Sequence, residues 1–84
     1  MAGQIENMVE ITDEDIKKFE IVRRSGITNM FNVSVVEALS GLSPEKQKEI
    51  WKIYESNDER VKKVIEKYDE EIEREAEKLR KALE

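Results

Sequence analysis

The feature that most constrains the fold is the last 40 residues, which contain neither glycine nor proline. Within them, one set of mostly apolar positions recurs at spacings of three and four, which places its members on one side of an α-helix. A sustained alternation of these spacings is the pattern of a coiled coil. The sequence therefore predicts a long amphipathic C-terminal helix. Its stripe consists of Trp51, Tyr54, Asp58, Val61, Ile65, Tyr68, Ile72, Glu75, Leu79 and Ala82.

A helix of this length would extend about 60 Å, further than a core of two short helices can cover. A chain of 84 residues buries only a small core, and without cysteine the common remaining way to stabilise it is oligomerisation. We therefore expect a homo-oligomeric bundle or coiled coil with an open number of protomers. The distal helix could instead pack on a different protein, or fold back through a bend at Ser56 to Asp58. The predicted oligomer interface consists of Val61, Ile65, Tyr68, Ile72 and Leu79.

Two shorter helices are predicted before the long one. The first begins after Thr12, which suits the N-cap position and precedes three acidic residues, and it ends at Gly26. The second runs from about Val33 to Ser40, with Asn32 as N-cap and Gly41 at its end. Because this second helix is short and apolar on most sides, we expect it to be well buried.

These patterns predict an all-α protein with three parts. We expect a disordered or frayed N-terminus at residues 1–10, a small helical domain at residues 11–55 and an oligomerisation helix at residues 56–84. No apolar run approaches the roughly 20 residues that span a bilayer, and the first residues lack the order of a signal peptide. We therefore expect a cytoplasmic protein.

The composition argues against most catalytic chemistry. Histidine and cysteine are both absent, which removes the nucleophile triads that need them and the usual zinc sites. The acidic clusters lack the loop and glycine of a calcium site. We therefore expect a non-catalytic protein with no cofactor and no metal. The 20 acidic and 15 basic residues give a net charge of −5, which argues against a general affinity for nucleic acid.

One segment nevertheless keeps DNA binding open as an alternative. In SVVEALSGLSPEKQKEIWKI, a short apolar helix, a glycine turn and a serine-capped helix with Lys46, Lys48 and Lys52 have the order of a helix-turn-helix. The pattern is imperfect, because Glu37 stands where a small residue is usual. Two glutamates on the second helix would also face the same phosphates.

The segment RRSGITNMFN, residues 23–32, is the candidate ligand site. A turn after a helix end exposes backbone N–H groups, and its cations and polar side chains add donors for a phosphate or carboxylate. A purely structural interpretation is equally physical: Gly26 ends a helix, the arginines complement its dipole, and Met30 and Phe31 anchor the loop in the core. The candidate ligand-binding residues are Arg23, Arg24, Thr28 and Asn29.

The run IVRRSGITNMFNVSVVEAL also resembles a motif, I-R-x-S-G-x-T-N-M-F-D followed by an apolar helix, of very small uncharacterised proteins from Gram-positive bacteria and their phages. The resemblance covers roughly residues 16–40, and Asn32 stands where the motif has aspartate. It implies a phage or mobile-element origin, a location in the host cytoplasm and a counter-defence role. In that role a homo-oligomer would sequester a nucleotide-like ligand. Two alternatives stay open: an inhibitor or adaptor that caps a host protein through its long helix, and a helix-turn-helix DNA-binding regulator.

Overall fold

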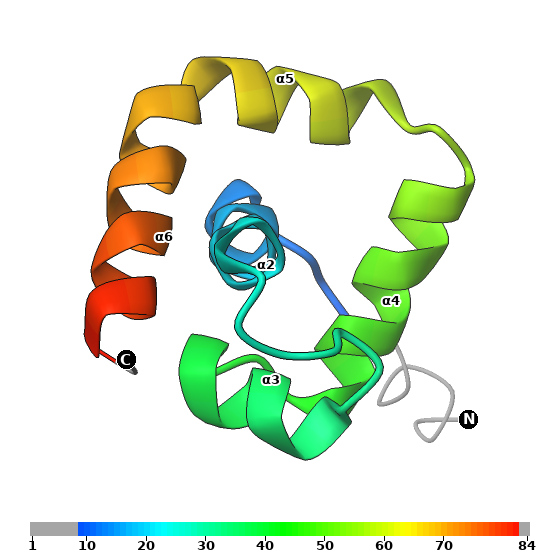
Figure 1. The fold of residues 1–84 in the computed structure, drawn as a ribbon. Coiled ribbons are helices and arrows are strands. Elements are labelled where there is room, and N and C mark those ends of the chain that lie inside the picture. The colour runs from blue at the N-terminus through cyan, green and yellow to red at the C-terminus, as the bar shows by residue number, and fades with distance from the viewer. Residues whose placement is uncertain (1–8, 83–84) are drawn as a thin grey trace.

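The computed structural model describes residues 9–82, and this range contains five α-helices and no strand. Helix α2 lies at the centre, and the other four helices surround it like the sides of a frame (Figure 1). The all-α fold class is therefore confirmed. Residues 1–8 of the segment predicted to be disordered lie outside the described range, whereas Val9 packs against the core. The helices are α2 (Asp13–Ser25), α3 (Val33–Ser40), α4 (Pro44–Glu55), α5 (Glu59–Lys67) and α6 (Asp69–Ala82).

The central helix begins and ends where its caps predict. The Asp15 N–H donates to the Thr12 hydroxyl at 3.1 Å, and the Thr12 N–H donates to the Asp15 carboxylate at 3.0 Å. Lys46 of α4 reaches the same carboxylate at 3.1 Å. Burial alone would raise the pKa of the Asp15 carboxyl, but the hydrogen bonds from Thr12 and Lys46 outweigh it and lower that pKa. Gly26 ends the helix in the left-handed conformation, with φ 68°.

Local caps also fix α3 and the start of α4. The Asn32 side chain accepts from the Val35 N–H, and Gly41 ends α3 with φ 78°. Ser43 caps α4 by accepting from the Lys46 N–H at 3.3 Å, as predicted for a serine before a proline. The two helices are further tied by the buried Gln47 side chain. Its amide donates to the backbone carbonyl of Val33 at the start of α3, at 3.1 Å, and to that of Leu42 in the turn between α3 and α4, at 3.0 Å.

The prediction of one continuous long C-terminal helix is wrong, whereas the bend at Ser56 to Asp58, which the sequence left open, is present. The stretch forms three helices, α4, α5 and α6, with breaks at residues 56–58 and at Tyr68. At the first break Asn57 takes a left-handed conformation with φ 56°, and Asp58 then caps α5 by accepting from the Arg60 N–H at 2.9 Å. At the second, Tyr68 leaves helical geometry with φ −112°. The chain therefore turns two corners around α2 (Figure 1).

These corners have a packing reason. Helix α2 has 13 residues, so it is about 20 Å long, and a straight helix of 60 Å could keep only a third of its apolar stripe against it. By bending twice, the chain turns most of the stripe inward, whereas Asp58 and Ala82 stay exposed. Val64 joins the buried core with Phe19, while Tyr68 and Leu79 pack against that core. Residues 56–82 of the predicted oligomerisation helix therefore share one core with residues 11–55.

Helix α3 is the second departure from expectation. Val36 is its one fully buried side chain, whereas Val33 and Val35 are 41% and 36% exposed. The prediction that this helix is well buried is therefore wrong. The loop before it differs as well, because Met30 packs against the core but Phe31 is 75% exposed. The reason is the position of α3, which is one side of the frame and contacts α2 and α4 from outside.

Candidate functional site

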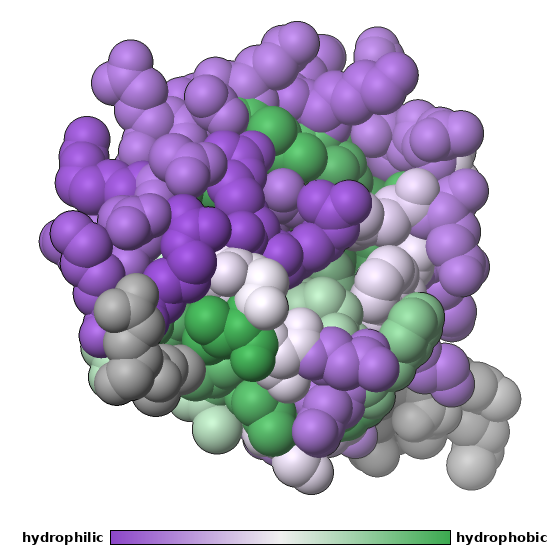
Figure 2. Space-filling view, viewed as in Figure 1, coloured by the Kyte–Doolittle hydropathy of each residue, from purple (hydrophilic) through white to green (hydrophobic). Residues whose placement is uncertain are grey.

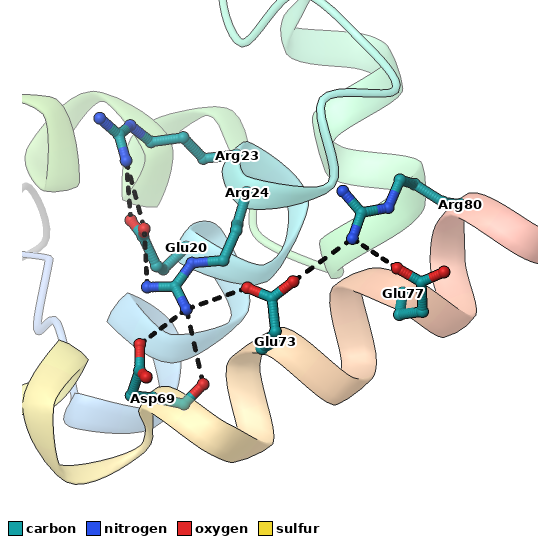
Figure 3. A network of polar contacts seen from close by, with 7 residues as sticks. All are labelled: Glu20, Arg23, Arg24, Asp69, Glu73, Glu77 and Arg80. Atoms are coloured by element: carbon teal, nitrogen blue, oxygen red, sulfur yellow. Dashed lines mark hydrogen bonds and ion pairs between the residues drawn. The ribbon is translucent and has the colours of Figure 1, made fainter.

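The two arginines of the predicted ligand site are paired with carboxylates. Arg24 lies 2.8 Å from the Asp69 carboxylate and 3.5 Å from that of Glu73, both on α6, and 3.7 Å from Glu20 on its own helix (Figure 3). The hydrogen bond to Asp69 is the main cause that raises the pKa of Arg24. Arg23 lies 3.2 Å from Glu20. Both cations therefore already have anionic partners within the chain.

The inner end of this network is a buried carboxylate. Glu20 is 3% exposed and accepts a hydrogen bond from the Tyr54 hydroxyl at 2.7 Å. Burial, and secondly the negative charge of Glu20, raise the pKa of Tyr54, so this phenol stays protonated and continues to donate. The guanidinium of Arg23 also lies 5.8 Å from the centre of the Tyr54 ring. Helices α2, α4 and α6 are thus joined by one polar cluster.

The cluster carries an excess of negative charge. The seven residues of Figure 3 include four carboxylates and three guanidinium groups. An incoming anion would meet this excess and would compete with carboxylates for the arginines. The geometry therefore supports the structural interpretation of the two arginines: Arg24 joins α2 to α6, and Arg23 pairs with Glu20 on its own helix.

Thr28 and Asn29 lie in the loop between α2 and α3, where the structure gives them local roles. The Asn29 side chain accepts from the Phe31 N–H at 2.9 Å, and its carbonyl accepts from the Asn32 N–H at the same distance. These are the bonds of an asparagine-stabilised turn. The Thr28 hydroxyl reaches the Asn29 carbonyl at 3.5 Å, which is long for a hydrogen bond. Asn29 therefore shapes the corner that positions Phe31.

The most unusual surface of the molecule lies on this corner and on α3. The Phe31 ring stacks on Trp51 of α4, with centroids 5.1 Å apart and planes within 9° of parallel. The outward side of the Phe31 ring stays open to solvent. Figure 2 shows hydrophobic residues gathered over α3 in the lower part of the view. We name the following exposed residues the neutral surface: Asn29, Phe31, Asn32, Val33, Ser34, Val35 and Ala38.

The neutral surface coincides with a gap in the charge pattern of the chain. Of the 15 basic and 20 acidic residues, Glu37 alone lies within residues 25–44. By contrast, every exposed side chain of α5 is charged, and so is every exposed side chain of α6 except Ala82. Sequence reasoning missed this surface because it took apolar residues as buried. The nearly uncharged run at residues 25–44 can be seen in the sequence and would have identified this segment as a surface of unusual composition.

The predicted oligomer residues lie along α5 and α6 on the side that faces α2. Val61 and Ile72 are buried within the single chain, and Ile65, Tyr68 and Leu79 are partly buried. Self-association through these residues stays a prediction, but their apolar surface already serves the core of one chain.

The structure contains the two adjacent helices that a helix-turn-helix requires, but most of the lysines on the second helix are already paired. Helices α3 and α4 pack against each other across a three-residue turn, as that motif requires. However, Lys46 pairs with Asp15 and Lys52 pairs with Glu49, each at 3.1 Å. Lys48 is exposed on the same helix. A phosphate backbone would find few unpaired cations here.

Within residues 9–82, no group of three or more acidic side chains is arranged to hold a metal ion. In the same part of the chain, no helix combines the length and apolar character that crossing a membrane requires. Comparison with known proteins finds no matching family model, and no curated protein or solved structure is detectably similar.

Proposed function

We propose that this protein is a non-catalytic binding protein that contacts another polypeptide through the neutral surface. The observation that carries the proposal is the exposure of Phe31, which is 75% exposed, whereas Phe19 of the same chain is completely buried and the other three aromatic residues are partly buried. An open aromatic ring among apolar neighbours costs free energy in an isolated chain and is typical of protein contact sites. Its stack on Trp51 holds the ring in place before any partner binds.

The buried polar groups support a non-catalytic role. Asp15 caps α2 and binds Lys46, and Glu20 is held by Tyr54 and Arg23. A catalytic acid or base would need access to a substrate, and these carboxylates are instead occupied by structural contacts. The phage or mobile-element origin and the counter-defence role implied by the resemblance remain part of the proposal.

Position-specific photo-crosslinking in the cells that express the protein tests this proposal. A photo-reactive aromatic residue would replace Phe31 in the full chain, and a matched control would carry it at Lys62, which is exposed on α5. We expect a discrete light-dependent adduct from position 31 alone. The proposal is wrong if position 31 gives no adduct, or if both positions give the same set of adducts.

Sequestration of a nucleotide-like anion by Arg23, Arg24, Thr28 and Asn29 stays a second prediction. Arg23 favours it, because half of its side chain is exposed and its one carboxylate partner is buried Glu20. Calorimetric titration with cyclic and linear nucleotides would test it. Heat that disappears in both Arg23→Ala and Asn29→Ala would support the nucleotide site, and the absence of heat across the panel would remove it.

A further inference from the structure

We infer that the polypeptide that binds the neutral surface does so through an extended, proline-rich segment that also carries a cation. The inference depends on the proposed function and specifies the chemistry of the partner at that same surface. Three features of the surface support it: hydrogen-bond donors that have no acceptor, an exposed aromatic ring that is held flat, and an exposed carboxylate that has no cation.

The donors lie on both sides of the exposed ring. Asn29 and Asn32 accept backbone N–H groups with their side-chain oxygens, whereas their NH2 groups donate to no described residue. The Ser34 hydroxyl and the Trp51 indole N–H also form no hydrogen bond within residues 9–82. In that range the fully buried side-chain polar atom without a partner is Gln47 Oε1, so the four donors face solvent. A partner that covers them without supplying acceptors would remove their hydrogen bonds to water.

Backbone carbonyls of an extended segment are suitable acceptors. The carbonyls of an α-helix bond within the helix, and those of a strand bond to neighbouring strands, of which residues 9–82 contain none. A segment in the polyproline II conformation has no internal hydrogen bonds, so its carbonyls stay available. Proline holds φ near the value of this conformation, and a proline-rich segment therefore loses little conformational entropy when it binds.

The aromatic ring favours proline as the side chain that covers it. Phe31 is 75% exposed, and its inner side lies flat on the Trp51 ring. Aromatic side chains on a protein surface are the usual contacts of proline-rich segments. Ser34 and Ala38, one turn apart on the exposed side of α3, are small, so they leave room for a segment that runs along the helix.

Charge specifies a cation on the same segment. Glu37 is exposed in the last turn of α3 and forms no ion pair with a described residue. This last turn contains no basic residue, so the carboxylate adds to the negative end of the helix dipole. A lysine or arginine of the partner would be stabilised by both. The net charge of −5 also attracts a basic segment at long range.

One short segment can make both contacts. Phe31 and Glu37 are separated by a rise of about 9 Å at the helical 1.5 Å per residue. A polyproline II segment rises about 3.1 Å per residue, so its cation would lie about three residues from the proline that covers Phe31.

Fluorescence titration of the full purified chain tests the inference, because Trp51 is the only tryptophan and contacts Phe31. The probe is an eleven-residue peptide with five prolines on each side of one arginine, which has no aromatic residue of its own. We expect a saturable change in Trp51 fluorescence at peptide concentrations up to 1 mM. Replacing the arginine by glutamate, or all prolines by alanine, should weaken binding at least tenfold.

Two variants of the protein assign the contacts. Phe31→Ala should weaken binding at least tenfold, and circular dichroism checks that it folds. Glu37→Lys should reverse the preference, so that the glutamate peptide binds more tightly than the arginine peptide. The control Glu66→Lys makes the same change of charge at an exposed position of α5, and it should keep the preference of the parent.

Three results would overturn the inference: no fluorescence change at 1 mM peptide, equal binding of the proline and alanine peptides, or an unchanged preference in Glu37→Lys. The two proposals fail in distinguishable ways. An adduct from position 31 in a chain that binds no proline peptide would refute the proline-rich segment but retain the protein-binding function. A chain with neither adduct nor peptide binding would refute both. In a cell lysate the arginine peptide should suppress the adduct, and an adduct that persists at saturating peptide would also refute the inference.

Discussion

Ile72→Ala provides the strongest test of how α6 is used. Ile72 is fully buried where α6 packs along α2. The substitution removes three carbon atoms, which at about 0.8 kcal/mol for each buried carbon group amounts to about 2.4 kcal/mol. The cavity adds to this loss, and the higher helix propensity of alanine returns roughly 0.4 kcal/mol. We therefore expect the free energy of unfolding to fall by about 2–4 kcal/mol.

A loss of this size is a large fraction of the stability of a small domain. At about 0.05–0.15 kcal/mol per residue, a chain of this length has a free energy of unfolding of roughly 4–13 kcal/mol. With a urea dependence of about 1 kcal/mol per molar, the midpoint should fall by about 2–4 M. Urea unfolding followed by circular dichroism and by Trp51 fluorescence measures this shift.

The loss in free energy of unfolding caused by Ile72→Ala should be the same at 5 µM and at 50 µM protein, since Ile72 is buried within one chain. If Ile72 instead lay between copies, as the sequence pattern suggested, the difference between parent and variant would depend on protein concentration. Arg74→Ala is the control, because Arg74 is exposed on the same helix and its replacement should change stability by less than about 0.5 kcal/mol. A loss below about 1 kcal/mol for Ile72→Ala, or one that varies with concentration, would refute the reasoning.

Three further predictions concern the polar and backbone features of the fold. A double-mutant cycle of Arg24→Gln and Asp69→Asn should give a coupling free energy of about 0.5–1 kcal/mol at 50 mM NaCl. Most of this coupling should disappear at 1 M NaCl, because salt screens an exposed ion pair. A coupling free energy that does not change with salt would contradict the ion pair. In urea unfolding, Gly41→Ala should lower the free energy of unfolding by about 1 kcal/mol, because Gly41 has φ 78°. Asn57 has φ 56°, so Asn57→Gly should leave that free energy unchanged or raise it. Equal effects of the two substitutions would rule out backbone strain as the cause. Because folding lowers the pKa of Asp15, its carboxylate contributes stability that is complete above the unfolded pKa near 4 and is lost as pH falls through the lower folded pKa. In urea unfolding, the parent should therefore lose more free energy of unfolding than Asp15→Asn between pH 5 and pH 2. Parallel losses would show that the carboxylate contributes nothing.

The boundaries of the first helices could be predicted because short-range hydrogen bonds fix them. Thr12 and Asn32 cap helices through groups within three residues, and Gly26 and Gly41 end helices by adopting positive φ. These interactions need no information from the rest of the chain. The same is true of Ser43, which caps α4 next to its proline.

The candidate site could be predicted only in part. The sequence identified the corner at residues 23–32 and the caps on both sides of it, but not the partners of its arginines. Asp69 and Glu73 lie more than 40 residues from Arg24 along the chain, and only the return of α6 to α2 brings them together. The exposure of Phe31 depends in the same way on where α3 lies relative to α4.

The sequence by itself determined that the chain is helical, where the first helices begin and end, and most of the residues on the apolar side of the C-terminal stretch. Only the tertiary structure decided what that stripe packs against. A periodic pattern specifies a buried side without specifying its partner, and the spacing of Val61, Tyr68 and Ile72 suits a second helix of the same chain as well as one from another copy. The bends at Asn57 and Tyr68 let one chain bury its own stripe on α2. Because the core was thereby filled from the C-terminal helices, α3 and Phe31 were left on the outside.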